Sequence, residues 1–72
     1  MLVIKYIKHP HHSQHWSELK DGTIHITSYC PDTLSEPVVI DIKRKYASKL
    51  LRTSLKEGWI IMVNNLFTQK EL

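Results

Sequence analysis

Histidine is the side chain in this 72-residue sequence best suited to chemistry, and four of the five histidines fall within seven positions: His9, His11, His12 and His15. Neutral imidazole is the commonest metal ligand in proteins. Helical spacing would place His11 and His15 together, whereas extended spacing would pair His9 with His11. No Cys-x-x-Cys or His-Glu-x-x-His pattern accompanies them, and structural zinc sites normally show two paired ligand clusters. Zinc or nickel binding is therefore a secondary hypothesis, and no other cofactor is expected. The simpler interpretation is a solvated loop.

Four cations recur at helical spacing later in the sequence. Lys45, Lys49, Arg52 and Lys56 stand at i, i+4, i+7 and i+11, so one side of a helix would present all four. At a rise of about 1.5 Å per residue, the row is about 16 Å long. Segment 43–57 carries six basic residues against one acidic residue, which leaves a net charge of −2 on the rest of the chain. An acidic protein surface and the phosphates of a nucleic acid would both fit such a row.

The helix that carries this row lacks the side chains that read bases. It contains no Asn or Gln, and the sequence shows no zinc finger, helix-turn-helix glycine or RNP-type aromatic strand. Contacts to nucleic acid would therefore be made mainly to phosphates, with weak specificity. We expect a small regulator or inhibitor that occupies an acidic protein partner, with nucleic-acid binding through the same helix as the alternative. The plainest rival is a lysine face that only keeps the domain soluble.

No arrangement of residues in the sequence predicts an enzyme. Cys30 is the only thiol, and its nearest base, His25, would point to the opposite side of a continuous strand. There is no carboxylate pair or glycine-rich phosphate loop, and Cys30 is expected to be a half-buried apolar side chain. One cysteine allows no internal disulfide, and neither a leader nor a membrane-spanning run is evident, so a cytoplasmic location without membrane contact is expected.

The hairpin expected over residues 16–29 decides which aromatic side chains are exposed. Asp21-Gly22 predicts a two-residue turn between strands 16–20 and 23–29, which would place Leu19 opposite Ile24. In that register Trp16 shares a polar face, whose other members are Glu18, His25, Thr27 and Tyr29. An exposed tryptophan beside polar groups is typical of a binding anchor, so Trp16 is predicted as a second partner contact. The alternative is that this face packs against the first strand.

A helix over about residues 43–57 follows from a single apolar stripe formed by Tyr46, Ala47, Leu50, Leu51 and Leu55. Asp41 is the expected N-cap and Gly58 the expected residue after the C-cap. The other expected elements are strands at 1–8, at 38–40 or 38–42 and at 59–67, loops at 9–15 and 30–37, and a fraying tail at 68–72.

These elements predict one α+β domain over residues 1–72, in which a small antiparallel sheet carries one amphipathic helix on one face. The apolar run 59–63 would place side chains on both faces of the sheet. One helix covers a single face, so either loops or a second copy in a homodimer would cover the other.

Overall fold

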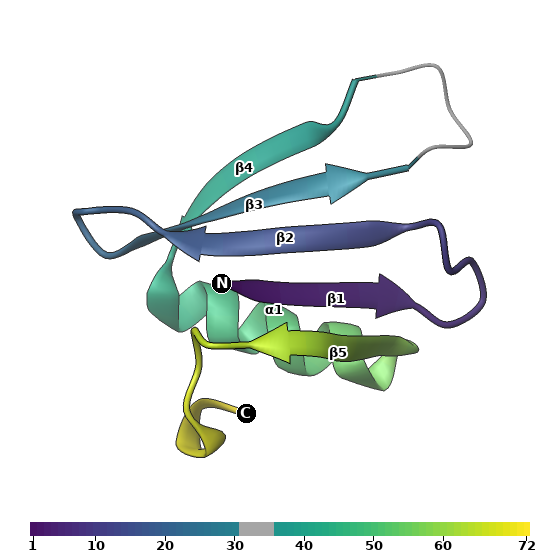
Figure 1. The fold of residues 1–72 in the computed structure, drawn as a ribbon. Helices are drawn as coiled ribbons and strands as arrows, with labels where there is room; N and C mark the ends of the chain where they lie inside the picture. The colour runs from purple at the N-terminus through teal and green to yellow at the C-terminus, as the bar shows by residue number, and fades with distance from the viewer. Residues whose placement is uncertain (31–35) are drawn as a thin grey trace.

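The structure, a computed structural model, describes residues 1–30 and 36–72. One five-stranded antiparallel sheet has the order β4-β3-β2-β1-β5 (Figure 1). The elements are β1 (Leu2–Tyr6), β2 (Ser13–Glu18), β3 (Thr23–Tyr29), β4 (Val38–Lys43), α1 (Arg44–Lys56), β5 (Trp59–Asn64) and the 3₁₀ helix η1 (Gln69–Glu71). A sheet with a single α-helix packed against it confirms the predicted α+β fold.

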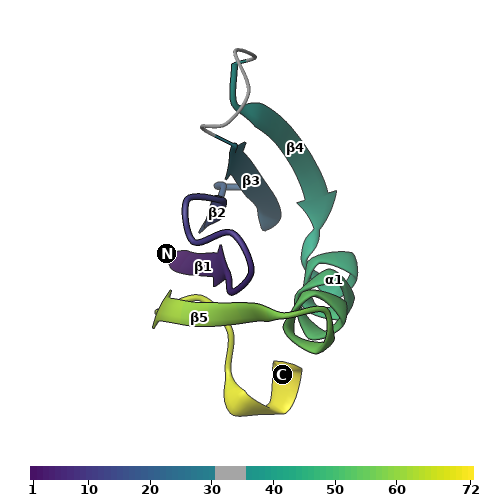
Figure 2. The same ribbon diagram turned by 90° about the vertical axis from the view of Figure 1, so that its right-hand side faces the viewer.

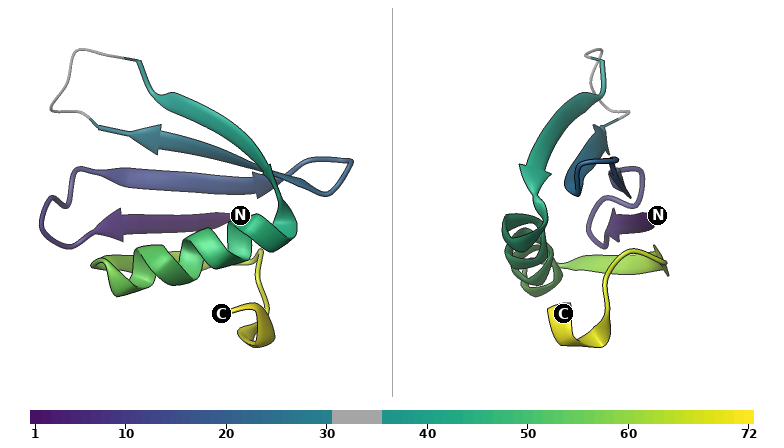
Figure 3. Two further views of the ribbon diagram at one scale, coloured as in Figure 1. Left: turned by 180° about the vertical axis from the view of Figure 1, so that it is seen from behind. Right: turned by 90° about the vertical axis from the view of Figure 1, so that its left-hand side faces the viewer.

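Helix α1 joins the two edges of the sheet. It follows β4 without a break and is separated from β5 only by Glu57 and Gly58. The sheet curves, and α1 lies on its inner side between β4 and β5 (Figure 2). Seen from behind, the helix crosses in front of the strands (Figure 3). No helix in the described parts of the chain is long and apolar enough to cross a membrane.

The core lies between the inner face of the sheet and α1. It consists of Leu2, Ile4, Trp16, Ile24, Ile26, Ala47, Leu51 and Phe67. Strands β1 and β3 bury alternate residues, as expected when successive side chains point to opposite faces of a sheet. Trp59, the first residue of β5, packs against this core.

The turn between β2 and β3 has three residues instead of the predicted two. The Leu19 carbonyl accepts a hydrogen bond from the Gly22 N–H, and the Leu19 N–H donates to the Thr23 carbonyl. Gly22 alone takes a positive φ, +83°. This pattern is a tight turn followed by a left-handed glycine, the usual form of a three-residue hairpin loop. The Asp21-Gly22 signal therefore located the turn correctly but not its length.

The added loop residue shifts the predicted register by one position. Glu18, not Leu19, lies opposite Ile24, and Trp16 lies opposite Ile26. A shift of one residue moves every side chain of a strand to the other face of the sheet. The predicted exposure of Trp16 is therefore wrong, because its side chain is completely buried beside Ile26.

The residues that cap α1 agree with the prediction at its C-terminal end only. The N-cap is Lys43, in extended conformation and without a side-chain cap, because β4 continues to that residue. Asp41 is part of β4, so its predicted capping role is wrong. At the other end Gly58 takes the predicted position after the C-cap, with a φ of +106°.

Several other boundaries differ from the prediction. Strand β1 ends at Tyr6, β2 already begins at Ser13, and β4 extends to Lys43. Strand β5 ends at Asn64, whose Oδ1 accepts hydrogen bonds from the Leu66 and Phe67 amides and turns the chain. Of the predicted loop 30–37, residues 31–35 lie outside the described residues.

The predicted fraying of tail 68–72 is wrong. The segment forms η1, in which Thr68 and Glu71 cap each other reciprocally. Phe67, which precedes this segment, inserts into the core, and Leu72, which directly follows η1, packs against the core. The tail is therefore anchored at both ends by apolar contacts.

Candidate binding surface on helix α1

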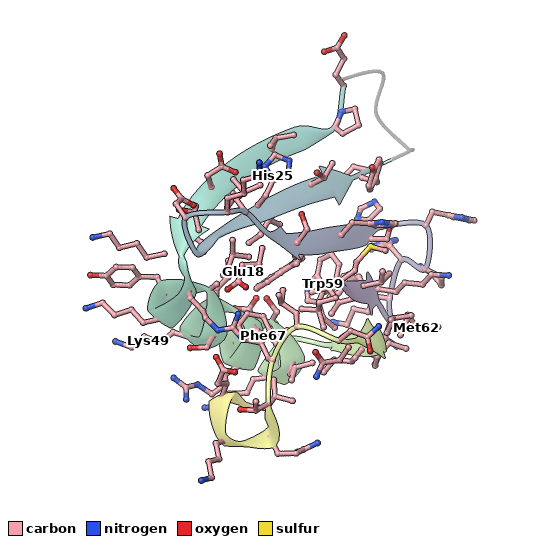
Figure 4. The ribbon with its side chains drawn as sticks, turned by 60° about the vertical axis from the view of Figure 1, so that its left-hand side comes forward. Glu18, His25, Lys49, Trp59, Met62 and Phe67 are labelled. Atoms are coloured by element: carbon pink, nitrogen blue, oxygen red, sulfur yellow. The ribbon has the colours of Figure 1, made fainter. Side chains whose placement is uncertain are left out.

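The predicted cationic row lies on the solvent side of α1. Lys45, Lys49, Arg52 and Lys56 are all exposed, whereas the buried residues of the helix are Ala47, Leu51 and Ser54. Figure 4 shows Lys49 directed away from the sheet. Within residues 1–30 and 36–72, no salt bridge engages any of the four cations. Their charge is therefore available to a partner.

Arg44, in the first turn of α1, does not belong to this row, because its guanidinium is already hydrogen-bonded to other residues of the protein. Its guanidinium makes a two-point contact with Glu71, at 2.8 and 3.0 Å, and a 2.8 Å bond with Glu18. It also donates to the Leu66 carbonyl and lies 4.9 Å from the centre of the Phe67 ring. These contacts tie the start of the helix to β2 and to the C-terminal segment. Arg44 therefore serves the fold, and the row is the part of the helix left for binding.

The Arg44 contact also fixes the ionisation of Glu71. Hydrogen bonds from Arg44, and next from the Thr68 amide, lower the pKa of Glu71 from 4.5 to about 2. In return, the hydrogen bond with Glu71 raises the pKa of Arg44. Both groups are charged over the whole physiological range, so the contact is a permanent ion pair.

Two apolar side chains border the row, although both belong to the predicted apolar stripe of the helix. Tyr46 is 52% exposed and Leu50 is 38% exposed. Ala47 and Leu51 occupy the side of α1 that faces the sheet. Tyr46 and Leu50 each come one residue earlier, so at about 100° per residue they lie on the flank of the helix. The Lys45 ammonium lies 5.1 Å from the centre of the Tyr46 ring. The helix thus presents cations and exposed apolar surface side by side.

The histidine-rich segment does not gather around one point. His9 and His12 stack with ring centres 5.2 Å apart in the turn after β1. His15 belongs to β2 and meets the Tyr29 ring edge-on at 5.1 Å, and His11 is exposed in the turn. Across the described residues, no group of three or more His, Cys, Asp or Glu side chains could hold a metal ion. The structure thus gives the zinc or nickel hypothesis no geometric support there.

A carboxylate–imidazole pair that sequence analysis missed lies on the outer face of the sheet. His25 and Asp41 face each other across β3 and β4, with 2.6 Å between His25 Nδ1 and Asp41 Oδ1. The two residues are sixteen positions apart, and only the strand register brings them together. The His25–Asp41 pair ties edge strand β4 to β3.

Cys30 is exposed, contrary to the half-buried position predicted.

No protein family model, curated protein or solved structure matches the chain. Functional inference therefore rests on the surfaces described above. Of the five predicted partner contacts, the structure leaves the four helix cations exposed together and removes Trp16 to the core.

Proposed function

We propose that this protein is a non-enzymatic binding protein that regulates or inhibits a partner by occupying an acidic protein surface with helix α1. The observation that carries the proposal is the exposed row of Lys45, Lys49, Arg52 and Lys56, free of salt bridges within the described residues and bordered by apolar side chains. A row of like charges steers an oppositely charged partner and fixes its register. Burial of the apolar border adds affinity.

The apolar border favours a protein partner over nucleic acid. A surface that binds phosphates gains mainly from cations and the counterions they release. Tyr46 and Leu50 expose large apolar side chains instead, and Tyr in particular is enriched at protein interfaces. A complementary partner would carry carboxylates along about 16 Å, with an apolar strip beside them. An acidic amphipathic helix has this chemistry.

The test reverses two charges in the middle of the row. Lys49→Glu with Arg52→Glu should abolish binding, because the partner's carboxylates would then meet like charges, while the circular dichroism spectrum stays unchanged. Lys8→Glu with Lys20→Glu is the matched control, since both lysines are exposed, neither belongs to α1, and the change in net charge is identical. The measurement is capture from lysate of the native host, with and without nuclease treatment. The retained proteins are identified by mass spectrometry, and their isoelectric points are calculated from their sequences.

Acidic proteins retained by the wild type and by the control variant, but not by the helix variant, support the proposal. Equal retention by the folded helix variant contradicts it. Signal that disappears with nuclease indicates the nucleic-acid alternative. In that case affinity for a short duplex DNA should fall with salt, with a log–log slope of about −3.6 for four phosphate contacts.

A further inference from the structure

Strand β4 is an edge strand whose first three residues carry no charge; Pro37 precedes them, and Asp41 and Lys43 follow in the second half of the strand. Within the described residues it pairs only with β3, in continuous register from Val38 to Lys43. Natural sheets protect such edges with prolines, bulges or charges, because unpaired backbone groups accept further strands. In β4 the first three residues are apolar and exposed on both faces, Val38 by 62%, Val39 by 51% and Ile40 by 43%.

The opposite edge strand, β5, also exposes apolar side chains, Ile60, Met62 and Val63, but its ladder is interrupted. Strand β5 shifts register against β1 between Val3 and Ile4, which marks a bulge. Such a bulge disrupts the regular ladder that an added strand needs. Of the two edges, β4 is therefore the one that offers an added strand an uninterrupted ladder.

We infer that β4 is a dimerisation edge, on which two copies of this chain pair antiparallel about a two-fold axis with Ile40 opposite the second copy's Ile40. In a two-fold pair, if residue i opposes residue j, then j opposes i. Directly opposed residues also point to the same face of the sheet, so the axis must pass through a residue position. The choice of register then reduces to the choice of that central residue.

Charge selects the central residue. Only centres at Ile40 and Asp41 pair five of the six residues of β4. A centre at Asp41 would oppose two carboxylates directly, which destabilises a cross-strand pair. A centre at Ile40 pairs Ile40 with itself, Val38 with Ile42 and Val39 with Asp41, so no like charges meet.

This arrangement leaves the helix surface accessible. Helix α1 begins directly after Lys43, at one end of β4. In an antiparallel pair, the two Lys43 residues lie at opposite ends of the ladder, so the two helices start far apart. The dimer therefore does not bring the two cationic rows together, and both stay available to partners.

The size of the contact predicts a weak dimer. Five paired residues extend about 17 Å, and interfaces below the standard size belong to transient complexes. We expect a dissociation constant on the order of 0.1 mM. Sedimentation equilibrium over a range of concentrations measures it.

The first test changes Val39, which this register places opposite Asp41 of the second copy. Val39→Lys creates two opposite-charge pairs and should lower the dissociation constant roughly two- to tenfold, whereas Val39→Glu creates two like-charge pairs and should raise it by a similar factor. The net charge of the chain is +3, so long-range repulsion would favour the reverse order. Effects of equal sign in the two variants, or a wild type that stays monomeric up to about 1 mM, would overturn the proposal.

The second test locates the axis. In a Cys30→Ser background, single cysteines at positions 38 to 41 are oxidised under mild conditions, and Thr53→Cys on the exposed helix surface gives the collisional baseline. The disulfide yield should peak at Ile40→Cys. A peak at another position, or no yield above the baseline, contradicts the proposed pairing. In the Lys49→Glu, Arg52→Glu variant the difference between Val39→Lys and Val39→Glu should persist, which separates dimerisation from partner binding.

Discussion

At the scale of single residues, Trp16 shows how a side chain suited to recognition serves stability instead. Its indole N–H donates to Gln14 Oε1 at 3.1 Å, and the Gln14 amide in turn donates to the Ser28 hydroxyl at 3.1 Å. Its ring meets Phe67 edge-on at 6.0 Å. Trp16 thus links β2 to the C-terminal segment and supplies the largest fully buried side chain of a thin core.

Trp16→Ala should therefore lower the free energy of unfolding by about 3–5 kcal/mol, since it removes a buried ring and leaves a cavity. A loss of this size approaches the whole stability of a small domain. Trp16→Phe keeps an aromatic ring and should cost clearly less. Urea unfolding followed by far-UV circular dichroism measures both. A Trp16→Ala variant with the wild-type midpoint would contradict the buried position.

At the scale of elements, Gly22 in the turn between β2 and β3 and Gly58 after α1 differ in how well they would tolerate a side chain. Gly22 has a φ of +83° and open space around an added Cβ, whereas Gly58 has a φ of +106° and would place that Cβ 3.4 Å from Tyr6 Cε1. Gly22→Ala should cost about 1 kcal/mol, and Gly58→Ala about 2–3 kcal/mol, because the backbone of Gly58 lies further from the left-handed region open to other residues. Thermal unfolding of the two variants gives the order. Equal losses would contradict it.

Sequence analysis succeeded for elements with local patterns and failed where distant contacts decide. The apolar stripe and Gly58 located α1 to within one residue at each end. The Asp21-Gly22 signal is compatible with loops of two or three residues, and packing of Trp16 against Phe67 fits only the longer one. Likewise, nothing local indicates that Asp41 meets His25 across the sheet. The four exposed helix cations were predictable because helix periodicity alone places them.

At the scale of the whole molecule, Arg44 holds together segments that are distant in sequence. Its guanidinium contacts Glu18 at the end of β2 and Glu71 in η1, 26 and 27 residues away. It also covers the Phe67 ring that closes the core. This contact therefore fixes the position of the C-terminal segment together with the Asn64 hydrogen bonds to Leu66 and Phe67.

The depressed pKa of Glu71 makes this contact sensitive to acid. The pKa is lowered from 4.5 to about 2, so the folded state favours the carboxylate. The resulting stability is fully present above about pH 4.5 and is lost as the pH falls towards 2. Glu71→Gln should be less stable than the wild type at pH 7, with a shallower decline between pH 5 and 2, because the amide cannot titrate. Urea midpoints measured across this pH range test the prediction. Parallel profiles of the two proteins would show that Glu71 is not paired with Arg44 in solution.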